Sequence, residues 1–97
     1  MSKLKIVSDK EDISDIIKSA ISTEIKRLEI GLNKTNKEIK RFEYEYKIDS
    51  KLFLAQFTAE DLNGGDDEYI RWTGELKIRE RILEDLKKLR DIEYVSN

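Results

Sequence analysis

The sequence predicts an all-α protein, an antiparallel helical hairpin in which two long helices are joined by a short helical connector. Proline, the strongest helix breaker, is absent from all 97 residues. Apolar residues recur at helical spacing within two long stretches, residues 8–47 and 66–94. Between these stretches the pair Gly64–Gly65 interrupts the pattern. We therefore expect a single domain, residues 1–97, with a coiled-coil-like hairpin.

The first stretch contains a heptad pattern in which residues follow one another at alternating steps of four and three. One member, Thr35, is polar. So narrow a line of apolar side chains cannot form a core alone, so another helix must cover it. We call this line the seam. Its members are Ile21, Ile25, Leu28, Leu32, Thr35, Ile39, Phe42 and Tyr46.

The first long helix is predicted at residues 8–47. Ser8 and Glu11 have the spacing of a capping box, which places its start. Gly31 is the one glycine inside it, and the sequence leaves open whether the helix is continuous there. Residues 1–7 alternate apolar and basic side chains. A single strand would lack a pairing partner within the chain, so we favour a flexible tail over a strand added to a partner's sheet.

The connector is predicted at residues 49–62. Asp49 can cap it, and Ile48 with Phe53 can form a hydrophobic staple. The third helix is predicted at residues 66–94, opened by acidic residues that favour a helix N-terminus.

Trp72 is the only tryptophan of the chain. We interpret it as a buried plug between the third helix and the connector, packed on Phe53 or Phe57. The alternative role is that of an anchor in a protein interface.

Two helices rarely enclose enough apolar surface for independent stability, so the sequence predicts a partner chain. A homodimer is the simplest solution. The predicted interface combines the start of the first helix with the end of the chain. It comprises Ile13, Ile16, Ile17, Ile21, Ile25, Leu28, Leu32, Tyr94 and Val95.

Composition argues against several functions. The chain has no histidine and no cysteine, which excludes ordinary zinc sites and histidine-based proton transfer. The acidic cluster at residues 60–68 matches no calcium loop, so we expect neither a metal nor another cofactor. No catalytic motif is recognisable, and we do not expect an enzyme. The chain has no apolar run of membrane-spanning length and no cysteine, and we expect a cytoplasmic protein.

A locally basic stretch extends from Lys34 to Arg41 and is mixed with Glu38. The formal net charge is −2, so the chain has no overall basic field that would attract nucleic acid. We interpret the stretch as a solvated helix face. If it does contact phosphates, binding must fall steeply with salt.

The segment from Phe57 to Trp72 reads FTAEDLNGGDDEYIRW, and Gly74, Glu75 and Leu76 follow. Together with the upstream residues 41–53, it resembles a family of small, highly charged prokaryotic proteins, over residues 41–90. The resemblance implies two long helices joined by a short phenylalanine-containing helix. Several members are encoded beside small toxins, so it also implies an antitoxin-like partner protein.

Our leading hypothesis is therefore a non-catalytic protein-binding module that neutralises a toxin by covering its active surface. The alternative is a homo-oligomeric coiled-coil scaffold without a toxin partner. Nucleic-acid binding through residues 34–41 is the third hypothesis.

Overall fold

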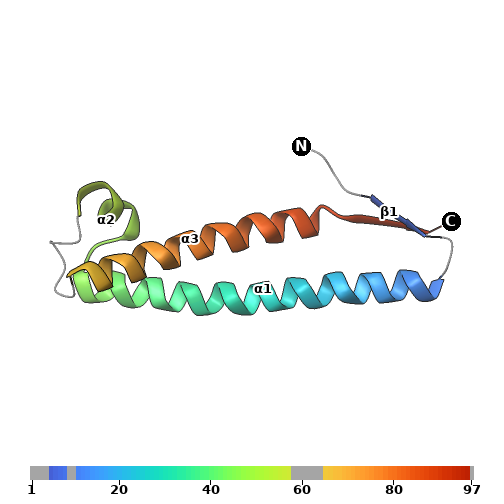
Figure 1. Ribbon diagram of the computed structural model, residues 1–97, viewed down its shortest axis with the longest axis horizontal. Helices are drawn as coiled ribbons and strands as arrows, with labels where there is room; N and C mark the ends of the chain where they lie inside the picture. The colour runs from blue at the N-terminus through green and yellow to red at the C-terminus, as the bar shows by residue number, and fades with distance from the viewer. Residues whose placement is uncertain (1–4, 9–10, 58–64, 97) are drawn as a thin grey trace.

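The computed structural model describes residues 5–8, 11–57 and 65–96. The described elements follow in the order β1 (Lys5–Ser8), α1 (Glu11–Tyr46), α2 (Ser50–Gln56), α3 (Gly65–Arg90) and β2 (Glu93–Ser96). Figure 1 shows a thin rod in which α1 and α3 lie antiparallel, α2 sits at one end and the strands at the other. The rod measures 59 × 24 × 18 Å.

The two long helices pack against each other, which confirms the predicted helical hairpin. α1 has 36 residues and α3 has 26. At about 1.5 Å per residue, α1 is therefore about 15 Å longer than α3. The helix α1 is continuous through Gly31, where an added Cβ would meet the Ile82 side chain of α3 at an ordinary 3.5 Å.

The seam of α1 faces the core, and α3 supplies its cover within the same chain. Leu28, Ile39 and Phe42 are buried, as is Leu86 of α3. Thr35, the polar member, is also buried. Its hydroxyl group lies within hydrogen-bond distance of the backbone carbonyl and the side-chain carboxylate of Glu75. Because a buried hydroxyl needs a partner, this contact favours a single register of the two helices.

The end of α1 is closed by a Schellman motif. The Ile48 N–H donates to the Glu43 carbonyl at 3.2 Å, and Lys47 between them has a φ of 54°. Asp49 then caps α2 by accepting from the Leu52 N–H at 2.8 Å, as predicted. Ile48 packs against the buried cluster of Phe42, Phe53 and Trp72, so the two residues of the predicted staple lie in the same part of the core.

Replacing Lys47 with glycine is expected to stabilise the protein. A side chain in the left-handed region costs about 1–2 kcal/mol, and glycine avoids this cost. Glycine also raises the conformational entropy of the unfolded chain, which offsets part of the gain. The net gain is about 0.5–1 kcal/mol, which corresponds to a rise in melting temperature of about 2–6 °C. Thermal unfolding followed by circular dichroism measures it. Lys40→Gly, the same change in the middle of α1, should lower stability by about 1 kcal/mol. A lower melting temperature for Lys47→Gly would contradict the motif.

The connector is attached to the hairpin by aromatic side chains. Trp72 is fully buried and lies flat against Phe53, with ring centroids 3.8 Å apart, and stacks on Phe42 at 5.4 Å. Its indole N–H donates to the Ser50 hydroxyl at 2.9 Å. The predicted role of Trp72 as a plug between connector and third helix is thus confirmed.

Several predicted boundaries are wrong. The helix was predicted to begin at Ser8, but Ser8 ends β1 and α1 begins at Glu11. The last helix was predicted to reach residue 94, but it ends at Arg90. Of the connector predicted at residues 49–62, the structure describes helix α2, which ends at Gln56, and residues 58–62 lie outside the described residues.

The two terminal segments form a parallel strand pair, in which β1 aligns with β2 from Lys5 opposite Glu93 to Ser8 opposite Ser96. The expectation that residues 1–7 lack a pairing partner within the chain is therefore wrong for Lys5–Ser8. Parallel strands need a long connection, and the whole hairpin provides it. Pairing with β1 gives backbone groups of residues 93–96 hydrogen-bond partners outside α3, although the sequence pattern predicted helix up to residue 94.

Candidate protein-binding surface

The longer helix α1 runs past the end of α3. Ile82 of α3 lies against Gly31 of α1, and the helices are antiparallel, so Arg90, the last residue of α3, is level with about residue 23 of α1. The Arg90 side chain reaches back to pair with Glu29 at 2.8 Å. The part of α1 that precedes this level is therefore not covered by α3. Figure 1 shows β1 and β2 lying along this part of α1. The seam loses its helical cover here, so apolar side chains of α1 reach the surface.

An open apolar groove lies at this place, with a volume of about 320 Å³. Ile21 and Ile25 of α1 form its floor together with Ile92, which follows the end of α3. Lys18, Ser22, Lys26 and Glu29 complete the lining. We call this surface the isoleucine groove. Its apolar floor and charged rim suit an amphipathic segment of another protein, because the floor can be buried while the rim stays hydrated.

The predicted interface residues do not all lie together. Ile21 and Ile25 are half-buried and line the groove. Ile16 is 67% exposed, and Ile13 is also exposed further towards the start of α1. Ile17 and Leu32 are half-buried. Leu28 is only 7% exposed, which leaves little of its side chain for a partner.

Tyr94 and Val95 lie within β2, and their backbones pair with Ile6 and Val7. Ile92 was not among the predicted interface residues, because the pattern placed it inside the last helix. The signal that could have found it is its position beside Tyr94 and Val95, where strand-forming residues replace the helical repeat.

The acidic cluster predicted around the start of α3 is described only in part. No group of acidic side chains among the described residues could hold a metal ion. Of the predicted acidic cluster, Asp67 and Glu68 lie in the first turn of α3, and residues 60 and 61 fall outside the described part. None of the helices in the described ranges has the length and apolar character needed to cross a bilayer.

Comparisons of the chain with family models, curated proteins and solved structures find no match. The isoleucine groove must therefore be interpreted from its own residues.

Proposed function

We propose that this chain is a non-catalytic protein-binding module, antitoxin-like, that binds a partner protein through the isoleucine groove. The observation that carries the proposal is the open apolar groove at the end of α3, where Ile21 and Ile25 of the seam are only half-buried. When a partner covers apolar surface that the chain leaves exposed to water, binding is stabilised by about 25 cal/mol per Å² of buried apolar surface. A cytoplasmic location, in which the chain meets its partner, is part of this proposal.

A segment that covers the groove and continues along α1 also contacts Ile17, one turn before Ile21, whereas Ile16 lies about 140–180° around the helix from Ile21 and Ile25. The charged side chains at the rim, Lys18, Lys26 and Glu29, would fix the orientation of the bound segment. Such masking requires no chemistry from this chain, since a toxin is neutralised as soon as its active surface is covered. The resemblance of residues 41–90 to toxin-associated proteins supports a toxin as the partner.

The test is co-expression of this chain with the product of the gene that adjoins its own. We expect growth inhibition by that product to disappear and the two proteins to elute together from a sizing column. Ile21→Asp should abolish both effects, because it places a charge on the apolar floor. Ile30→Asp, at an exposed position of the same helix, is the matched control and should leave both intact. Growth inhibition that persists with the wild-type chain, with no complex formed, would contradict the proposal.

The alternative function is a homo-oligomeric scaffold in which the grooves of two copies cover each other. The seam favours it as well, since identical apolar floors are self-complementary. Light scattering separates the two functions. A mass of twice 11.5 kDa that reverts to one chain in Ile21→Asp, without any effect on the neighbouring product, would establish the scaffold instead.

A further inference from the structure

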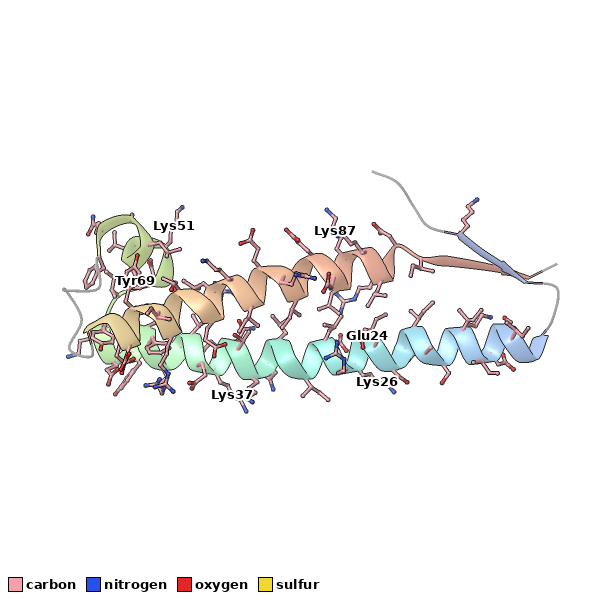
Figure 2. The ribbon with its side chains drawn as sticks, in the orientation of Figure 1. Glu24, Lys26, Lys37, Lys51, Tyr69 and Lys87 are labelled. Carbon is pink, nitrogen blue, oxygen red and sulfur yellow. The ribbon has the colours of Figure 1, made fainter. Side chains whose placement is uncertain are left out.

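The outward side of α1 has a row of four lysines, of which one, Lys26, also lies at the rim of the isoleucine groove. Lys26 and Lys37 are eleven residues apart, about three turns, so they lie on the same side of the helix. Figure 2 shows both on the side turned away from α3, whereas Lys87 lies on the opposite side of the molecule. Lys34 and Lys40 fall within the same arc, and all four are exposed. We call these four residues the basic stripe.

The carboxylates that flank the stripe are held by other groups. Arg27 donates to Glu24 at 2.6 and 2.7 Å, and this hydrogen bond lowers the pKa of Glu24, so its carboxylate stays ionised beside Arg27. Arg90 of α3 reaches Glu29 at 2.8 Å. Neither carboxylate is therefore engaged by a lysine of the stripe.

The same is true towards the end of α1. Arg41 pairs with Glu38 at 3.3 Å and with Glu45 at 3.9 Å. Glu43 accepts a hydrogen bond from the Ser50 backbone N–H at 2.8 Å. Every carboxylate of α1 between residues 24 and 45 thus has a partner outside the stripe. Within the described ranges, none of the four lysines has an ion pair.

The stripe therefore carries a local positive potential although the chain is acidic overall. At physiological ionic strength the Debye length is about 8 Å. Acidic side chains on the far side of a rod 24 × 18 Å across lie about two such lengths away, so salt screens them from the stripe. A partner that approaches α1 from outside meets the lysines and not the net charge.

The apolar content of this face indicates what kind of partner fits. Along the described helix from Lys26 to Tyr44, the large exposed apolar side chains of this face are Ile30 and Tyr44, 72% and 86% exposed. They are 14 residues apart, about 21 Å, too sparse for a helix seam or for insertion into a lipid surface. A second copy would set lysines against lysines. The stripe fits a polyanion that is bound mainly through charge.

We propose that the basic stripe binds the phosphodiester backbone of single-stranded nucleic acid, with a base stacked on Tyr44. The lysines extend over 14 residues, about 21 Å, which matches several successive phosphates of an extended strand. A single strand can follow the convex surface of a helix, and its unpaired bases can stack on an exposed aromatic ring. This function goes beyond the isoleucine groove, and the stripe lysines Lys34, Lys37 and Lys40 do not line that groove.

The probe is a fluorescein-labelled single-stranded RNA of mixed sequence, about 20 nucleotides long, followed by fluorescence anisotropy. For four phosphate contacts, log K against log salt should have a slope of about −3. The triple variant Lys34→Glu, Lys37→Glu and Lys40→Glu should bind at least about 100-fold more weakly at about 50 mM salt. Tyr44→Ala should lose about tenfold in affinity with an unchanged slope.

The matched control is Lys77→Glu, Lys87→Glu and Lys88→Glu on exposed positions of α3, which changes the net charge equally. It should bind the RNA within about threefold of the wild type, and both triple variants should keep the wild-type melting temperature within about 2 °C. Three results overturn the proposal: no binding by the wild type at low salt, equal losses in both triple variants, or competition by polyglutamate as effective as by unlabelled RNA.

Discussion

Truncation of Trp72 to alanine is expected to destabilise this protein by about 3–5 kcal/mol, enough to remove most of its stability. The indole ring lies between Phe42 and Phe53, with ring planes inclined by 9° and 3°, and Tyr46 stacks on it at 5.8 Å. Its removal leaves a cavity bounded by three aromatic rings. It also deprives the buried Ser50 hydroxyl of its donor.

The loss of Trp72 should first detach α2. In this helix of seven residues only Ser50 and Phe53 are buried, and both contact the indole. Urea unfolding followed by far-UV circular dichroism measures the effect. Tyr44→Ala is the control, because Tyr44 is 86% exposed and its truncation should change stability by less than about 0.5 kcal/mol. If Trp72→Ala and Tyr44→Ala unfold at similar urea concentrations, the aromatic stack does not hold the connector.

The helices could be predicted from the sequence because their signals are local. The heptad steps from Leu28 to Phe42 identify a face that must be covered, and α3 covers it. Asp49 and Ile48 predict the start of α2, because a helix cap and a hydrophobic staple involve only residues close together in the sequence. The role of Trp72 followed from its place at the end of the hairpin, where the connector's phenylalanines were already within reach.

The strands could not be predicted, because they depend on residues far apart in the chain. Lys5 aligns with Glu93 only after the hairpin has brought the two ends together. The basic stretch from Lys34 to Arg41 is recognisable in the sequence, but the partners of the carboxylates around it are not. The sequence places Glu29 near Lys26, but the structure shows that Arg90 from α3 engages it. Counting charges along the sequence therefore does not show which carboxylates remain near the lysines without an arginine partner.

Leu28→Asp, the second large effect, should unfold the protein or reduce its stability by several kcal/mol. Leu28 is buried in the seam beneath α3, and a carboxylate at this position would lose its hydration without gaining a cation. Ile30→Asp is the control, two residues further along the same helix and 72% exposed. It should change stability by less than about 0.5 kcal/mol. Equal melting temperatures for the two variants, measured by circular dichroism, would show that the seam is misplaced.

The pH dependence separates the buried charge from the lost packing. Burial raises the pKa of an introduced aspartate above its unfolded value of about 3.9, so the folded state binds more protons than the unfolded state. The stability of Leu28→Asp should therefore increase as pH falls through the raised pKa, and this gain is complete below the unfolded pKa. Leu28→Asn has nearly the same shape and cannot titrate. Because the native carboxylates are common to both variants, the difference between their urea midpoints from pH 7 to pH 4 isolates the aspartate. A difference that does not change with pH would mean that residue 28 remains hydrated, and the hairpin would then be open at the middle of α1.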